Sequence, residues 1–151
     1  MSTDPYAPPG APIIPDKRGA SAFVAVLVGL AIDVGGSIVL SMVLGFGYAI
    51  LLVSNGTDPD KIAETIMAGG STSFQAIAMT LGGVLSILGG YTCTRMARRR
   101  DYRLGIVLAC ISIAITTLMT VGAYSLARHA GNAALEFALV MVGTRLGFVR
   151  A

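Results

Sequence analysis

Asp33 is the residue of this sequence whose type and position most suggest chemistry, because it interrupts the apolar run from Ala20 to Val53. It follows Arg18 by 15 residues, which corresponds to a helical rise on the order of 20 Å. If this run crosses a membrane, an acid at that depth is strongly unfavourable unless it is shielded from lipid. We therefore predict that Asp33 faces another helix or a polar cavity.

The helical neighbours of Asp33 support this orientation. Positions at steps of four residues before and after it carry small side chains, which allow two membrane helices to approach closely. Two of these positions, Ser37 and Ser41, also carry hydroxyl groups, so Asp33, Ser37 and Ser41 form a candidate intramembrane polar site. The whole row is Ala25, Gly29, Asp33, Ser37, Ser41, Gly45 and Ala49.

Two interpretations of Asp33 are open. In the functional one, the carboxyl group binds a proton or a cation, as intramembrane acids often do. In the structural one, a neutral acid hydrogen-bonds to serine, threonine or backbone groups across helices, because burial in a low dielectric favours the neutral form of a carboxyl group. The structural interpretation is favoured because no basic residue is expected at the same depth.

The other residues whose side chains could take part in chemistry have simpler explanations. Glu136 is expected near the external end of the last apolar segment, where it forms a candidate ion pair with Arg128. His129 has no visible partner that would make it a metal ligand or a general base. Cys93 and Cys110 are interpreted as small packing residues. Because no phosphate loop, nucleophile motif or zinc motif occurs, we expect neither an enzyme nor a bound cofactor.

The composition is that of a membrane protein. Of 151 residues, 54% are hydrophobic and only 13% are charged, whereas about a quarter are charged in a soluble domain. The charges cluster between long apolar runs, so lipid is the expected solvent. The net charge of +3 does not indicate nucleic-acid binding, because the basic residues flank the apolar runs and therefore fit a topology signal.

The apolar runs predict an all-α bundle of four transmembrane helices over residues 20–151, preceded by a disordered, proline-rich tail over residues 1–19. The first run exceeds a hydrocarbon core of about 30 Å, so it must tilt, kink or project, with Gly35-Gly36 as a candidate kink. Asp58 and Pro59 predict the start of a short surface helix. The other spans are expected at Thr72–Met96, at Leu104–Ala127 and, after a connection at Arg128–Asn132, at Ala133–Val149, which spans fully or only partly.

The basic residues predict the orientation. With the N-terminus inside, nine of the eleven Lys and Arg residues are cytoplasmic, and only Lys61 and Arg128 are external. The positive-inside rule therefore places both termini in the cytoplasm. A cluster of arginines after the second span provides most of this signal, and it also suits binding to anionic lipid headgroups. Its members are Arg95, Arg98, Arg99, Arg100 and Arg103.

Two segments carry a resemblance: Ile32-Asp33-Val34-Gly35-Gly36-Ser37, and the stretch from Gly89-Gly90-Tyr91 to Ala97-Arg98. With the opening Asp4-Pro5-Tyr6-Ala7-Pro8-Pro9, they resemble uncharacterised small bacterial inner-membrane proteins that have Asp-x-Gly-Gly in the first span and Gly-Gly-Tyr then Ala-Arg ending the second. The resemblance covers about the first two-thirds of the chain. It implies a bacterial protein with four spans and implies no activity.

Small residues recur at helical spacing in the other spans too, and they suit packing within the bundle or between copies.

The first functional expectation is a non-enzymatic accessory or assembly component that acts through helix–helix association. Its partners would be membrane lipids and either a second copy or another membrane protein. The alternative is a small oligomeric transporter or a proton or ion pathway that uses Asp33. The small residues that recur at helical spacing, and that would serve such association, include Gly82, Ser86 and Gly90 in the second span, Ser112, Thr116 and Thr120 in the third, and Gly143 and Gly147 in the fourth.

Overall fold

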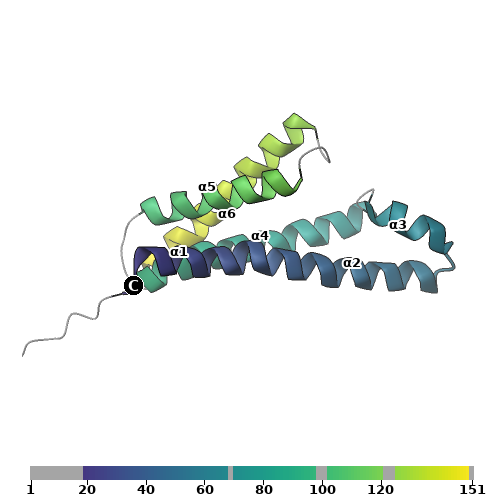
Figure 1. Cartoon of the computed structure of the whole chain (residues 1–151), viewed down its shortest axis with the longest axis horizontal. Helices are drawn as coiled ribbons and strands as arrows, with labels where there is room; N and C mark the ends of the chain where they lie inside the picture. Colours follow the sequence, from purple (N-terminus) through teal and green to yellow (C-terminus); the bar gives the residue numbers. More distant parts are fainter. Residues whose placement is uncertain (1–18, 68–69, 98–101, 121–124, 150–151) are drawn as a thin grey trace, which may run out of the picture.

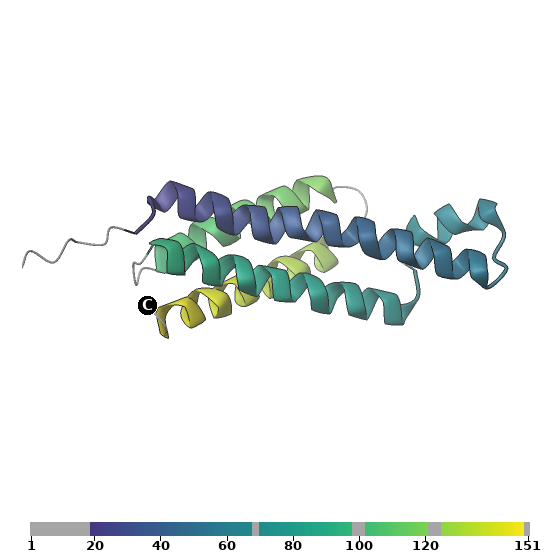
Figure 2. The same ribbon diagram turned by 90° about the horizontal axis from the view of Figure 1, so that it is seen from below.

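A computed structural model describes residues 19–67, 70–97, 102–120 and 125–149, and within these ranges the chain forms helices and no strand. The first long helix and α4 run side by side, and α5 and α6 lie across one face of that pair (Figure 1, Figure 2). The elements are α1 (Ala22–Leu30), the π-helical turn η1 (Ala31–Gly35), α2 (Gly36–Ser54), α3 (Pro59–Met67), α4 (Thr72–Ala97), α5 (Tyr102–Met119) and α6 (Leu126–Val149).

Among the residues that the structure describes, three helical segments are long and apolar enough to cross a membrane, which confirms the all-α prediction and fits a membrane protein. They are the continuous α1-η1-α2 segment at 22–54, α4 at 72–97 and α5 at 102–119. The 24 residues of α6 measure about 36 Å by helical rise. Because α6 is less apolar than these three segments, it is not among the candidate spans, and the predicted fourth span stays a prediction.

The boundary between the third and fourth predicted helices is wrong. The third ends at Met119 rather than Ala127, and Arg128–Asn132, predicted as a connection, lies inside α6. Ser125 explains the shift: its carbonyl oxygen accepts a hydrogen bond from the His129 amide at 3.1 Å, and serine is a favourable residue at a helix start. Gly131 and Asn132 are therefore helix-interior residues and not a turn.

The predicted surface helix is present. It begins at Pro59, and the Asp58 carboxylate accepts the Asp60 amide at 3.3 Å, as expected of a capping residue. Beyond it, the Ser71 amide donates to the Tyr48 hydroxyl at 3.1 Å, and the rings of Tyr48 and Phe74 stack at 4.5 Å. These contacts fasten the end of α2 to the start of α4.

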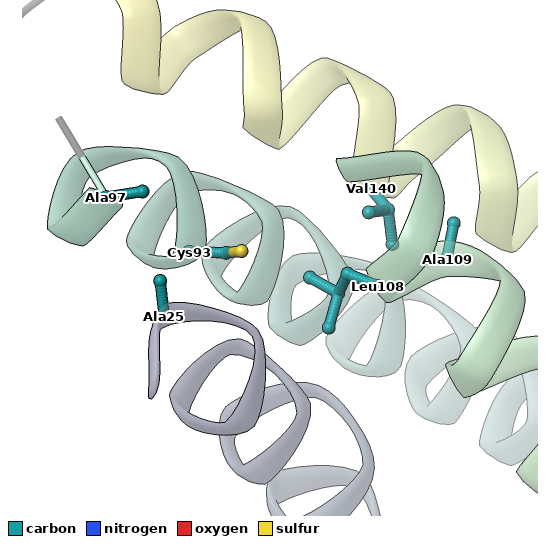
Figure 3. Close-up of a cluster of buried hydrophobic side chains, with 6 residues drawn as sticks. All are labelled: Ala25, Cys93, Ala97, Leu108, Ala109 and Val140. Carbon is teal, nitrogen blue, oxygen red and sulfur yellow. The ribbon is translucent and has the colours of Figure 1, made fainter. Parts of the chain in front are cut away.

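The core lies at the other end of the bundle, where all four long helices meet. The Ala20 amide donates to the Met96 carbonyl at 2.9 Å, and the rings of Tyr102 and Phe148 meet edge to face at 4.7 Å. The start of α1, the end of α4, the start of α5 and the end of α6 therefore share this end. Figure 3 shows the buried apolar side chains turned toward one another from these helices: Ala25, Cys93, Ala97, Leu108, Ala109 and Val140.

Glycines set how closely these helices approach. A Cβ atom added at Gly143 of α6 would overlap the backbone carbonyl of Ile87 in α4, and one added at Gly90 would overlap the Val140 carbonyl oxygen. Between α1 and α4, a Cβ atom on Gly29 would lie 3.0 Å from the Gly89 carbonyl oxygen. The backbones themselves are in contact here, which is how small residues stabilise membrane helix pairs.

We expect Gly143→Ala to reduce the free energy of unfolding by about 1–3 kcal/mol, because the added methyl group has no space against α4. Gly45→Ala is the matched control, since a Cβ atom there has no neighbour within 4 Å. Its effect should stay within about 0.5 kcal/mol. The measurement is SDS-induced unfolding in mild detergent. Equal effects of the two variants would contradict the packing of α4 against α6.

Candidate intramembrane polar site

The Asp33 carboxyl group is the meeting point of three helical segments. Asp33 is only 2% exposed. The Ser86 hydroxyl of α4 donates to its Oδ1 atom at 2.7 Å, and the Ser112 hydroxyl of α5 donates to its Oδ2 atom at 2.6 Å. These O···O distances lie in the short range typical of hydroxyl groups that donate to carboxylates. Each carboxyl oxygen therefore has its own donor, from a different helix.

The backbone around Asp33 explains how the side chain reaches both donors. Asp33 is the central residue of η1, so the helix is locally widened at this residue, and π-helical turns are frequent at functional sites. This π-helical turn spans Ala31–Gly35, and the kink predicted at Gly35-Gly36 stays a prediction. On α4, a Cβ atom added to Gly89 would lie 3.0 Å from the Asp33 Cβ atom. The absence of a side chain at Gly89 lets η1 approach α4.

Asp33 also lies at the inner end of a cleft of about 510 Å³ between α2, α4, α5 and α6. Ser37 and Ser41, which the sequence grouped with Asp33, line this cleft, but neither donates to the carboxyl group: the Ser41 hydroxyl donates to the Ser37 carbonyl at 2.8 Å. The polar residues lining the cleft are Asp33, Ser37, Ser41, Ser86, Ser112, Thr116, Thr120, Asn132 and Glu136.

Glu136 is the second acid of the cleft. It is half-buried on α6, and the Thr116 hydroxyl lies 3.4 Å from each of its carboxylate oxygens. Glu136 lines the cleft together with Asp33 and Ser112. Glu136 therefore faces the same polar cluster as Asp33. Arg128 lies about two turns earlier on α6, and its pairing with Glu136 stays a prediction.

Sequence reasoning did not place Glu136 in the cleft, although a signal was present. Steps of four along α6 connect Glu136 with Val140 and Thr144, and both of these residues are fully buried. This row marks the face of α6 that packs against the bundle. The sequence places Ser86 and Ser112 each on a small-residue or hydroxyl-bearing face, but it does not link either residue to Asp33.

The remaining candidates lie away from this cleft. Cys93 is buried in the apolar core, in agreement with a packing role, whereas Cys110 is exposed. The Arg95 guanidinium contacts the Tyr91 hydroxyl and lies 5.6 Å from the centre of its ring. Arg103 is exposed near the start of α5, and Arg98, Arg99 and Arg100, like residues 1–18, lie outside the described residues. Within the described ranges, no group of three or more His, Cys, Asp or Glu side chains is placed to hold a metal ion.

Comparisons with protein-family models, with curated proteins and with solved structures find no match to this chain.

We expect Asp33→Leu to destabilise the bundle by about 1–3 kcal/mol, because it removes the acceptor of the buried Ser112 hydroxyl and leaves the Ser86 hydroxyl only its longer bond to the Gly82 carbonyl oxygen. The branched side chain would also crowd Gly89. Asp33→Asn retains the size of the side chain and one oxygen acceptor, so its cost should be smaller. SDS-induced unfolding of both variants in mild detergent measures the difference. If Asp33→Leu is as stable as the original chain, the two serine bonds do not hold the helices together.

Proposed function

We propose that the chain is a small, non-enzymatic membrane protein whose cleft binds a proton or a monovalent cation at Asp33. An imbalance of charge carries this proposal. The lining of the cleft, as far as the structure describes it, includes two carboxyl groups, Asp33 and Glu136, and no Lys, Arg or His. Acids inside membrane segments commonly mark proton or ion routes. A proton or cation is the species that would balance such a site.

The position of the cleft supports a direction of access. Its lining comes from η1 and the start of α2, the middle of α4, the last part of α5 and the middle of α6. Toward the opposite end, the buried apolar side chains close the bundle (Figure 3). An ion would therefore reach Asp33 from the end at which α5 is followed by α6, and the apolar core would block its onward movement.

For the cellular setting, we propose a bacterial cytoplasmic membrane, four spans and both termini in the cytoplasm. The predicted bias of nine basic residues to two supports this orientation, and the sequence resemblance favours the bacterial membrane. Support for a fourth span comes from α6 itself, which buries Gly143, Thr144 and Gly147 against the other helices. The cleft would then open toward the outside.

Helix–helix association is a second candidate function, and the outer part of α2 favours it. No residue of α2 is buried, and a Cβ atom at either Gly45 or Gly47 would have no neighbour within 4 Å. Small residues on an open face allow another membrane helix to approach. The partner would be a second copy or another membrane protein, and membrane lipid would cover this face otherwise.

The ion proposal is tested with the purified chain in liposomes that contain a pH-sensitive dye, under an imposed potassium diffusion potential. We expect proton influx above that of empty liposomes, and a loss of about tenfold or more in Asp33→Asn, because only an ionisable group can carry the charge. Asp60→Asn is the control, since Asp60 lies on α3, outside the lining of the cleft. Sodium and potassium fluxes are measured in parallel.

Two results would argue against the ion proposal. Influx through Asp33→Asn that equals that of the original chain would exclude Asp33 as the site. If the original chain carries no proton, sodium or potassium, the cleft has no ion function, and chemical cross-linking in mild detergent then tests for association. Cross-links through cysteines introduced at positions 45 and 47 would support the second candidate.

The topology makes a separate prediction. If α6 crosses the membrane fully, a reporter fused after Ala151 will be cytoplasmic, because an even number of spans returns the chain to its starting side. Arg145 would then extend toward the inner headgroups. Paired phosphatase and fluorescent-protein fusions provide the measurement. A periplasmic C-terminus would mean an odd number of spans and would contradict the bundle proposed above.

A further inference from the structure

We propose that the cleft binds a protonated organic amine, a ligand with an apolar body and an ammonium group that pairs with the Glu136 carboxylate. This inference rests on the proposed function, a cation site in the cleft, and names the class of cation that the cleft accepts. Three features of the cleft carry it: its size, its apolar walls and the direction of the hydroxyl groups that line it.

The size and the walls of the cleft suit an organic body. Its volume of about 510 Å³ lies within the range of about 300–1,000 Å³ that is typical of small-molecule sites, whose walls are mostly apolar with a few placed polar groups. A bare ion would fill only a small part of this volume. Methionine adapts its shape to different ligands, and three of the chain's seven methionines line the cleft. The apolar lining includes Met42, Met79, Met119, Ile115 and Leu139.

The hydroxyl groups of the cleft present acceptors to a ligand. Five of the six hydroxyl groups in its lining donate their proton to the protein itself, so only their oxygen lone pairs remain for a bound molecule. A ligand with N–H donors matches this lining, whereas an anion does not. The five belong to Ser41, Thr116 and Thr120, which donate to carbonyl oxygens of their own helices at 2.8, 2.6 and 2.7 Å, and to Ser86 and Ser112, which donate to Asp33 at 2.7 and 2.6 Å.

Glu136 and Thr116 mark the point at which the ammonium group would lie. The Thr116 hydroxyl gives its proton to the Ser112 carbonyl at 2.6 Å. Its oxygen therefore stands as a second acceptor 3.4 Å from each carboxylate oxygen of Glu136. An ammonium group has three N–H donors, so one such group can donate to both residues, and its bond to the carboxylate is charge-assisted.

The two acids of the cleft differ in their access to a ligand of this size. Glu136 is half-buried and lines the cleft, so its carboxylate can be reached from the open space. Asp33 is only 2% exposed, and each of its oxygens already accepts a serine hydroxyl. The amine is therefore assigned to Glu136, while Asp33 stays at the inner end of the cleft.

Three probes with the same apolar body test the proposal on the original chain. Phenylbutylamine is protonated at neutral pH, as lysine is. Its trimethylammonium derivative keeps the charge but has no N–H donor, and phenylbutanol is neutral. We expect the amine to bind about tenfold or more tightly than either of the others, because it alone makes charge-assisted hydrogen bonds. Isothermal titration calorimetry in mild detergent measures the affinities, with empty micelles as the blank.

A first pair of variants tests the acid. Glu136→Gln removes the charge and keeps the size of the side chain, so the affinity for phenylbutylamine should fall by about tenfold or more. Glu64→Gln is the matched control, because Glu64 lies on α3, outside the lining of the cleft. It should bind the amine as the original chain does.

A second pair tests the hydroxyl acceptor. Thr116→Val removes the oxygen beside Glu136 and should lower the affinity for the amine by about threefold or more. Thr80→Val is the control: the Thr80 hydroxyl makes the same kind of bond, to the Ala76 carbonyl at 2.8 Å, but Thr80 does not line the cleft. The unfolding profiles of all four variants show whether each one is folded.

The outcomes separate this inference from the proposed function. Equal affinities of the original chain for the amine and for either of the other probes would overturn it, whatever the variants do. Equal affinities of Glu136→Gln and Glu64→Gln for the amine would also overturn it, while ion influx that depends on Asp33 would still support the proposed function. Binding of the amine with no influx of proton, sodium or potassium would support this inference and count against ion movement through the cleft.

Discussion

The carboxyl group of Asp33, placed inside an apolar helix, is the constraint on which the middle of the bundle depends. A carboxyl group removed from water needs hydrogen-bond donors or a compensating charge, and lipid supplies neither. The first helix must therefore pack against helices that carry donors at the same depth. Ser86 on α4 and Ser112 on α5 meet this requirement, and their two bonds fix the relative positions of three helical segments at one point.

The close approach that these bonds need comes from glycine. Ser86 lies one turn before Gly89 and Gly90 on α4, and these glycines bring η1 and α6 against the α4 backbone. Neighbouring small residues of α4 thus pack against two different elements: Gly89 against η1 and Gly90 against α6. Toward the core end the helices touch along their backbones, whereas on the other side of Asp33 they separate and leave the cleft. The position of Asp33 at this transition makes it both a packing residue and the innermost polar group of the cleft.

The sequence predicts part of this arrangement well. Hydropathy and the position of the charges predict the long helices. The small residues around Asp33 correctly indicate that its side chain faces another helix. The α6 boundary was missed because Gly131 and Asn132 resemble turn residues, whereas the helix already starts just after Ser125. The sequence does not predict the partners of Asp33 for another reason: they are 53 and 79 residues away along the chain. Periodicity identifies which face of a helix is buried, but it does not identify the helix against which that face packs. Glu136 shows both effects, since the wrong boundary placed it near a loop.

The hydrogen bonds of Asp33 also join the two candidate functions. The Ser86 hydroxyl lies 2.7 Å from Asp33 Oδ1 and 3.3 Å from the Gly82 carbonyl oxygen of its own helix, so its proton has a second acceptor on α4. When Asp33 is ionised, the carboxylate is the stronger acceptor, and the bond holds η1 against α4. When Asp33 receives a proton, that advantage falls, and the intrahelical bond competes. If a proton binds at Asp33 as we propose, this contact between helices would change with it, and an ion in the cleft would thereby influence how the bundle packs.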